Sequence, residues 1–396
     1  MRRYTALFFL IMFMIGTDTF LISPMLPTLQ AEFGVSTEAA GWMLGAYTLG
    51  SAVFALIAGP LSDGWNRRTV LLGGLLGFSL STFLCGSAEG FWTMCLFRFL
   101  AGISAAFTAP QVWASIPSVM PPARISKTMG IAFAGLAASQ ALGVPIGSWL
   151  AAAGWSVPFR AVGAASLLLA AAAYALLPDM KPAAGKGGAG SILGRYRTLL
   201  ASGRARSGFL GYLLLHLGSG TAFAFAGKWL ADRFALPIGQ IGTVLMVLGI
   251  GTLLGSLLPA YAVRRLGRIP TMAAGMGLLI VLYPLLPYGP GLPLVTAGYL
   301  LIFAVLGVLF PIVMEALTSL NASVRGTISS LANSTMNGAN TVGAWAAGLL
   351  YVRFGGYASI GLFAAVCLAL SLGTFLLGGL FRERETGAER EAAAAS

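Results

Sequence analysis

The sequence has 396 residues, of which 57% are hydrophobic and only 9% are charged. Water-soluble domains carry about 25% charged residues, so this composition excludes an ordinary soluble protein and indicates lipid as the solvent. The formal net charge of +12 would suit a nucleic-acid-binding protein only if the charges were clustered for that purpose. The three cysteines lie in apolar segments without metal-ligand or disulfide spacing, and we expect them to be small buried hydrophobes.

The first predicted element begins at the N-terminus, where two arginines precede the apolar run YTALFFLIMFMIG. A basic start followed by an apolar run is also typical of a signal peptide. This segment has no small-residue cleavage site, and Asp18 lies where cleavage would occur. We therefore interpret it as a first transmembrane helix.

Many further apolar segments follow along the chain. A helix needs about 20 mostly apolar residues to cross a bilayer. The segments that meet this requirement are 5–27, 39–60, 69–88, 91–115, 128–153, 159–178, 207–230, 239–263, 269–288, 292–317, 326–352 and 356–380. The sequence thus predicts an all-α integral membrane protein with twelve transmembrane helices.

The basic residues predict how these helices are oriented. Most of the 24 Lys and Arg residues fall in segments on the same side of the membrane as the N-terminus. Cytoplasmic loops of membrane proteins carry such an excess of Lys and Arg. We therefore predict a multi-pass protein of the bacterial inner membrane with both termini in the cytoplasm. The high positive charge then reflects topology, and we expect no nucleic-acid partner.

A polar segment rich in Gly, Ala, Lys and Arg separates the sixth and seventh predicted helices. It is typical of a cytoplasmic linker, with a short amphipathic helix at the membrane surface. We expect the polar C-terminal tail to start as a helix and then fray. The predicted organisation is a six-helix bundle (1–178), a linker (179–206), a second six-helix bundle (207–380) and a cytoplasmic tail (381–396).

The two predicted bundles repeat. A shift of about 201 residues places Gly59 on Ala260, and it places the turn GPLSDGWNRR on AYAVRRLGRI. Both are short basic turns that join the second and third helices of their half. Internal repeats of this kind are typical of transporters, whose halves rock about a site near the bilayer midplane. The repeat therefore predicts two pseudo-symmetric halves.

The turn that begins at Gly59 carries the most specific motif. The chain resembles the major facilitator superfamily over its whole length, and within it the twelve-helix drug:proton antiporters and related metabolite exporters. The loop signature of that group is G-x-L-[AS]-D-R-x-G-R-[RK]. The positions that match it here are Gly59, Leu61, Ser62, Asp63, Arg67 and Arg68. Gly64 replaces an arginine and Asn66 replaces a glycine, and we expect Asn66 to keep a left-handed turn.

Such a loop can act as a conformational latch if its charges find partners in only one state. Asp63 would be stabilised against the positive N-terminal end of a neighbouring helix. The resemblance implies that this helix is the eleventh, at the closed cytoplasmic face. Arg67 and Arg68 would belong to the same latch, together with Gly59 and Leu61; the alternative is that both arginines only set topology.

Two charged residues lie well inside predicted helices. A charge at the bilayer centre costs about 2.5–3.5 kcal/mol on insertion scales, so Asp18 and Arg98 call for an explanation. Asp18 suits a proton-coupling or cation site, or a structural hydrogen bond. Arg98 and Gly102 match the R-x-x-x-G pattern of the family's fourth helix. The resemblance implies that Arg98 supports proton transfer, with Asp18 or a substrate anion as its partner.

Other polar residues are further candidates. Glu315 and His216 are alternative proton-coupling residues. The fifth predicted helix carries a stripe of small residues that lets another helix approach closely, and Pro145 can bend it. This stripe resembles the antiporter signature G-P-x-x-G-G in a variant form, through Gly135, Gly143, Pro145 and Gly147. The residues that we expect to line a substrate cavity are Gln111, Trp113, Gln140, Phe223, Asn333, Asn337 and Asn340.

No nucleotide-binding loop, metal cluster or nucleophile–base pair is recognisable, so we expect no enzymatic activity, no ATP, no metal and no cofactor. The resemblance and the intramembrane charges predict proton-coupled efflux of small, largely apolar molecules by alternating access, from a monomer in the lipid bilayer. The alternatives are an exporter for one metabolite, such as a purine, sugar, amino-acid derivative or opine, and a symporter or uniporter. A membrane sensor or scaffold would need a larger soluble domain.

Overall fold

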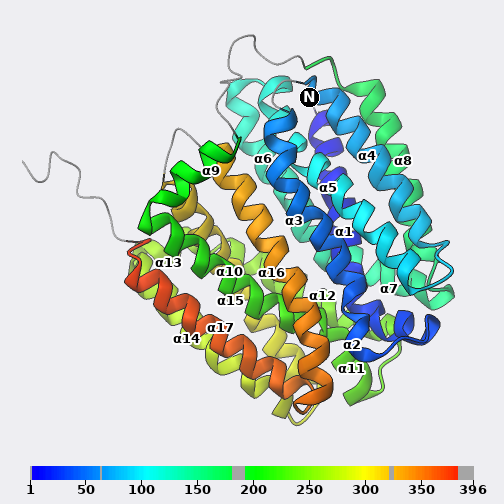
Figure 1. The fold of residues 1–396 in the computed structure, drawn as a ribbon, viewed down its shortest axis with the longest axis vertical. Helices are drawn as coiled ribbons and strands as arrows, with labels where there is room; N and C mark the ends of the chain where they lie inside the picture. The colour runs from blue at the N-terminus through cyan, green and yellow to red at the C-terminus, as the bar shows by residue number, and fades with distance from the viewer. Residues whose placement is uncertain (1, 63–64, 181–191, 321–324, 382–396) are drawn as a thin grey trace, which may run out of the picture.

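The structure is a computed structural model that describes residues 2–62, 65–180, 192–320 and 325–381. Every regular element in these residues is a helix, and none of them forms a strand (Figure 1). The helices before the linker are α1 (Arg2–Glu32), α2 (Thr37–Ala40), α3 (Trp42–Ser62), α4 (Arg67–Cys85), α5 (Phe91–Val119), α6 (Pro122–Ala138), η1 (Ser139–Gly143), α7 (Val144–Ala153) and α8 (Val157–Leu176). From the linker onward they are α9 (Ile192–Ala201), α10 (Gly203–Ala224), α11 (Ala226–Phe234), α12 (Ile238–Ser256), α13 (Pro259–Leu266), α14 (Arg268–Leu285), η2 (Leu286–Tyr288), α15 (Leu292–Thr318), α16 (Arg325–Arg353) and α17 (Tyr357–Leu377).

The helices confirm the predicted fold class. In the described residues, 11 helical segments are long and apolar enough to cross a membrane. The predicted span 326–352 corresponds to α16, which has 29 residues but is less apolar than those 11. Its composition explains the difference, because α16 carries several asparagines, serines and threonines among its apolar residues.

Several predicted spans are interrupted helices; in the span 239–263, for example, α12 ends at Ser256 and α13 begins at Pro259. The fifth consists of α6, η1 and α7, and the π-helical turn η1 ends two residues before Pro145. Proline has no N–H to donate to the preceding turn, and a π turn is a local way to accommodate that loss. The seventh consists of α10 and α11, which meet at Phe225. Helix α10 begins at Gly203, and α9 is a short helix within the predicted linker. Residues 181–191 and the tail beyond 381 lie outside the described residues.

The two halves lie side by side (Figure 1). Helix α3 packs along α16, η1 and α7 pack along α12, and α1 contacts α11. These contacts bring the backbones of the halves very close at the end of the molecule that carries α2 and α11. A Cβ atom at Gly41 would overlap the carbonyl oxygen of Ala344, and one at Gly227 would overlap the carbonyl oxygen of Ser23. We call this end the closed end, and the opposite end, where the chain begins, the N-terminal face.

The small residues of the fifth predicted span pack against α1. A Cβ atom at Gly135 would lie 2.4 Å from the Phe9 carbonyl oxygen, and one at Gly143 would lie 2.0 Å from the Thr17 hydroxyl. One turn further on, Gly147 faces Leu21. Glycines therefore allow the two helices to touch along several turns, as small residues do in membrane helix pairs. This packing fixes the position of α1 around residue 18.

Candidate functional site

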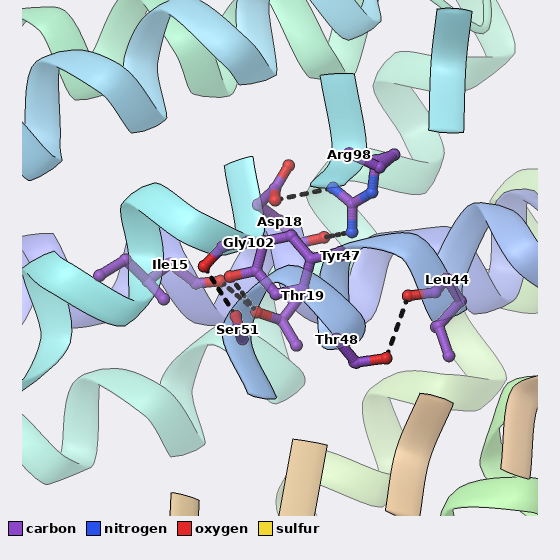
Figure 2. Close-up of polar contacts among 9 residues, drawn as sticks. All are labelled: Ile15, Asp18, Thr19, Leu44, Tyr47, Thr48, Ser51, Arg98 and Gly102. Atoms are coloured by element: carbon purple, nitrogen blue, oxygen red, sulfur yellow. Dashed lines mark hydrogen bonds and ion pairs between the residues drawn. The ribbon is translucent and has the colours of Figure 1, made fainter. Parts of the chain in front are cut away.

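A buried ion pair joins α1 to α5. Arg98 Nη1 donates a hydrogen bond to Asp18 Oδ2 at 2.7 Å, and neither side chain has any exposed surface (Figure 2). Arg98 Nη2 also donates to the backbone carbonyl oxygen of Asp18 at 3.3 Å. Removal of charges from water is costly, so such a pair is maintained only with good geometry and further hydrogen bonds. The structure thus selects Asp18 as the partner of Arg98.

Tyr47 of α3 covers the arginine. The Arg98 guanidinium carbon lies 4.5 Å from the centre of the Tyr47 ring, a distance typical of cation–π contacts (Figure 2). The Tyr47 hydroxyl lies 3.0 Å from the hydroxyl of Thr19, which is the residue after Asp18. The tyrosine therefore touches both helices that supply the ion pair.

The close packing of α5 against α3 explains why Arg98 is followed by a glycine, Gly102, one turn later. A Cβ atom at Gly102 would lie 2.0 Å from the carbonyl oxygen of Tyr47, so only glycine allows α5 to approach α3 this closely. The Ser51 hydroxyl donates to the Gly102 carbonyl oxygen at 2.9 Å and closes the same contact (Figure 2). The R-x-x-x-G spacing thus places Arg98 against the Tyr47 ring.

The ion pair is not fully saturated with hydrogen bonds. Thr82 of α4 lies beside the carboxylate of Asp18. Arg98 Nε is buried and has no hydrogen-bond partner in the part of the chain that the structure describes. Partly satisfied polar groups in a low-dielectric interior are energetically unfavourable and sensitive to small changes. A change in the charge of Asp18 would therefore alter the contacts of Arg98 directly.

Helix α3 also carries contacts to the second half of the molecule. The hydroxyl oxygens of Thr48 and Thr341 lie 2.8 Å apart in a buried hydrogen bond between α3 and α16. Further along the same interface, Ser334 donates to the Ala52 carbonyl oxygen at 2.7 Å. Because Thr48 follows Tyr47, one helix contacts the ion pair and the other half at the same level.

The other two predicted coupling residues lie elsewhere, in the second half. His216 is buried between the rings of Tyr212, at 4.5 Å, and Phe310, at 4.8 Å. Its Nε2 has no hydrogen-bond partner among the described residues. Glu315 is largely exposed and forms a 2.5 Å ion pair with Arg268. The structure thus brings together Asp18 and Arg98, but not His216 or Glu315.

The arginines of the loop motif contact their own half of the molecule. Arg67 donates to the Ala114 carbonyl oxygen at 2.5 Å. Arg68 donates to the Tyr174 carbonyl oxygen at 2.6 Å and to Asp179 at 3.2 Å. Gly59 and Leu61 belong to the last turn of α3. Asp63, the central residue of the predicted latch, lies outside the described residues.

The predicted left-handed conformation of Asn66 is wrong. Asn66 is extended, with φ −63° and ψ 117°, and it caps the N-terminus of α4. Its side-chain oxygen accepts hydrogen bonds from the backbone N–H groups of Arg68 and Met180, at 3.0 and 3.1 Å. Asparagine is among the best N-cap residues, and here capping decides its conformation.

The predicted cavity residues fall into separate groups. On α16, Asn337 Nδ2 donates to Asn333 Oδ1 at 2.8 Å. Asn340 packs over Gly220 of α10. Phe223 lies at the boundary of the halves, edge-on to Phe20 with 5.7 Å between ring centres.

The remaining three lie in the first half. Gln111 is buried in α5. Trp113 packs on Phe133, with 6.0 Å between ring centres. Gln140 belongs to η1, and its Oε1 is buried without a hydrogen-bond partner in the described part of the chain. Phe223 thus contacts Phe20 of the other half, and Gln140 lies on the π-helical turn that packs along α12.

Sequence reasoning missed Tyr47, Thr82 and Thr341. Each has a partner far away in the sequence, and neither its residue type nor its spacing distinguishes it from neighbouring polar residues or from core aromatic residues. The one available signal was the sequence Tyr47-Thr48, which places two hydroxyl groups at the middle of a span. Among the described residues, no three His, Cys, Asp or Glu side chains lie close enough to hold a metal ion.

These features define a multi-pass α-helical membrane protein built from two repeated halves, the first of which encloses a buried ion pair. This is the architecture of a secondary transporter. A sequence profile of the Major Facilitator Superfamily matches residues 8–202 and 208–396. The chain belongs to this superfamily; it is a transporter and not an enzyme.

Similar proteins agree with this assignment. The chain is 47% identical over 366 residues to the uncharacterized MFS-type transporter YceJ of Bacillus subtilis (strain 168), covering 92% of this chain and 94% of that one. It is 33% identical over 150 residues to Multidrug resistance protein 1 of the same organism, covering 38% of this chain and 39% of that one. The fold matches a bacterial homologue of the human lysosomal transporter Spinster, crystallised in an inward-facing, occupied conformation, with a TM-score of 0.75, 18% identity, and coverage of 96% and 98%.

Proposed function

We propose that this protein exports small, largely apolar molecules in exchange for protons. The observation that carries the proposal is the ion pair of Asp18 and Arg98, which is completely buried inside the first half. A carboxylate that is retained at membrane depth against its insertion cost is a natural site for a transported proton. The partial similarity to Multidrug resistance protein 1 supports drugs as substrates.

The orientation that suits this proposal places the N-terminal face in the cytoplasm of a bacterium. The excess of Lys and Arg on that side supports it. The closed end then faces the outside, and the structure corresponds to an inward-facing state. We further propose that the protein acts as a monomer in the inner membrane.

Burial of the ion pair controls when protons can exchange. In this state the side chains of Asp18 and Arg98 have no exposed surface, so a proton reaches Asp18 only after the helices around it have moved. Protonation removes the carboxylate charge and weakens its bond to Arg98. Tyr47 on α3 then loses a fixed partner, and α3 carries the change to α16 through Thr48.

The membrane potential can drive this cycle. Each elementary charge that moves across 100 mV gains about 2.3 kcal/mol, and a pH gradient adds to that. Transport by alternating access requires the protein to change between an inward-facing and an outward-facing state. The predicted latch at the loop that begins at Gly59 would have to reorganise in this change. We propose that Asp63 contributes to that latch through α16, while Arg67 and Arg68 anchor the loop to α5 and α8.

A second candidate function is export of one polar metabolite. The buried Oε1 of Gln140 favours it: this oxygen has no hydrogen-bond partner among the described residues, and a polar substrate can supply one. The hydrogen-bonded pair of Asn333 and Asn337 on α16 offers further polar groups. A symporter or uniporter on the same fold is a less favoured alternative, since the glycine-rich packing of α6 to α7 resembles that of exporters.

The test is proton movement in proteoliposomes that contain wild type or Asp18→Asn, challenged with dyes, antibiotics, purines and sugars. Glu32→Gln is a matched control, because Glu32 is an exposed carboxylate at the end of the same helix. We expect substrate-triggered proton flux in wild type and Glu32→Gln but none in Asp18→Asn. Response to many apolar compounds supports a drug exporter, whereas response to a single purine or sugar supports the second candidate.

Two results would contradict the proposal. Unchanged proton flux in Asp18→Asn would indicate that Glu315 or His216, and not Asp18, is the proton-coupling residue. Exchange of compounds across the membrane without any proton flux would indicate a uniporter.

A further inference from the structure

A second candidate site lies at the N-terminal face, at the start of α1 and α6. It is a cavity of about 580 Å³, within the size range of small-molecule sites. Its lining residues are Arg2, Thr5, Ala6, Phe9, Met120, Arg124, Lys127, Thr128 and Ile131. None of them belongs to the ion pair of Asp18 and Arg98 or touches it in the contacts described above. The cavity therefore needs an explanation of its own.

Three cations surround this cavity, and none of the described residues that line it is acidic. Arg124 and Lys127 lie three residues apart on α6, so they share one face of that helix. Arg2 comes from the start of α1. None of the three forms an ion pair with a residue in the part of the chain that the structure describes, and all three side chains are exposed. The mouth of the cavity thus carries a concentration of positive charge that suits an anionic ligand.

Polarity falls with depth along both helices. One turn beyond Arg2 and Arg124, the hydroxyl oxygens of Thr5 and Thr128 lie 3.5 Å apart. Thr128 is buried, so these hydroxyls lie beneath the mouth of the cavity. A further turn along each helix, the wall consists of Phe9 and Ile131. The cavity therefore has a cationic rim, a hydroxyl layer and an apolar base.

We propose that this cavity binds an anionic phospholipid through its phosphate headgroup. Cations at the ends of transmembrane helices lie at the level of lipid phosphates, and basic pockets between helices on the cytoplasmic side suit such headgroups. The two threonine hydroxyls can donate to phosphate oxygens, and the apolar base can contact the acyl chain. A soluble phosphate would use the cations and hydroxyls but would leave Phe9 and Ile131 without a partner, which favours the lipid.

The test compares nanodiscs of phosphatidylcholine alone with nanodiscs that also contain phosphatidylglycerol. The variant is Arg124→Gln/Lys127→Gln. The matched control is Arg264→Gln/Arg265→Gln, which removes the same charge from α13, outside the cavity. We expect phosphatidylglycerol to raise the Tm of wild type and of the control, and to have little effect on the cavity variant. The affinity for phosphatidylglycerol should fall roughly fivefold for each cation removed.

Two more variants separate charge from fold. Arg124→Lys/Lys127→Arg keeps both charges and should keep the lipid effect. Ala6→Trp fills the cavity without removal of a cation and should abolish the effect, with an unchanged Tm in phosphatidylcholine alone. An unchanged lipid response in Ala6→Trp would overturn the proposal.

Two alternatives to a specific lipid site, general attraction of lipid to surface charge and binding of a soluble anion, predict different results. An equal loss of lipid effect in the α13 control would overturn the site, because the effect would then depend on surface charge in general. If inorganic phosphate raises the Tm in phosphatidylcholine nanodiscs as much as phosphatidylglycerol does, the lipid assignment is overturned and the cavity binds a soluble anion.

Discussion

Thr48 and Thr341 form a buried hydrogen bond of 2.8 Å between their hydroxyl groups, and this bond joins α3 of the first half to α16 of the second. The residue before Thr48 is Tyr47, whose ring lies under the guanidinium of Arg98. Successive residues of one helix therefore contact the ion pair and the opposite half. This arrangement provides a short physical route from the protonation state of Asp18 to the interface that must rearrange during transport.

Replacement of Tyr47 tests this route. In Tyr47→Ala the cation–π contact is lost, which is worth about 0.5–2 kcal/mol. We expect substrate transport to become partly independent of the pH gradient, so that the ratio of transport with and without the gradient falls severalfold. Tyr47→Phe keeps the ring and loses only the contact with Thr19, so it should retain most of the coupling. Wild-type coupling in Tyr47→Ala would exclude this route.

Removal of one partner from the ion pair should destabilise the fold. In Arg98→Gln the carboxylate of Asp18 remains buried without its cation, and loss of one member of a buried pair typically costs about 3–5 kcal/mol. Thermal unfolding in detergent should show a clearly lower Tm. In the double variant Asp18→Asn/Arg98→Gln much of that loss should be recovered, because no unpaired charge remains.

An exposed pair provides the control for that experiment. Arg268 of α14 and Glu315 of α15 form a 2.5 Å ion pair, with 40% and 64% of their side-chain surface exposed. Exposed pairs contribute at most about 1 kcal/mol, so Arg268→Gln should leave the Tm nearly unchanged. If Arg98→Gln is no less stable than Arg268→Gln, the buried pair is not the stabilising contact that its geometry suggests.

Much of this molecule could be predicted from its sequence, because polar groups in lipid are costly and therefore conspicuous. Asp18 and Arg98 stand out as charges within apolar segments, and the small residues around Gly143 form a stripe at helical spacing. Tyr47 could not be found in this way, since a single tyrosine in a span has the same pattern as a core residue. Its role depends on contacts with α1 and α5, which the sequence alone does not reveal.

Two other features depended on distant contacts. Asn66 was expected to adopt a left-handed turn, but a hydrogen bond from Met180, at the start of the linker, favours the extended capping conformation. The sequence repeat aligns Arg67 with Arg268 and Ala114 with Glu315. Both arginines contact the position that the repeat predicts, but one donates to a backbone carbonyl and the other to a carboxylate. The repeat therefore predicts the geometry of the contact and not its chemistry.

The contact between α1 and the fifth span should tolerate no side chain at Gly143. A Cβ atom there would overlap Thr17, the neighbour of Asp18, so Gly143→Val must displace α1 and disturb the ion pair. We expect transport to fall at least tenfold in proteoliposomes with equal amounts of folded protein. Gly130→Val is a control in α6, because no heavy atom lies within 4 Å of a Cβ atom at that position. Equal activity of the two variants would contradict a requirement for close packing at Gly143.

The closed end should open when its glycines are enlarged. A Cβ atom at Gly41 would overlap the Ala344 carbonyl oxygen, and one at Gly227 would overlap the Ser23 carbonyl oxygen. Gly41→Val and Gly227→Val should therefore disfavour the state described here and increase the population in which the two halves are apart at this end. Glu38 and Arg353 form a 3.1 Å ion pair across the halves. Spin labels at these two positions would show longer label-to-label distances by pulsed electron paramagnetic resonance. Gly73→Val has open space around its Cβ atom and should leave the distance distribution unchanged. If the distances in Gly41→Val match those of Gly73→Val, contact between the halves at this end does not stabilise the state, and the equilibrium is set elsewhere in the molecule.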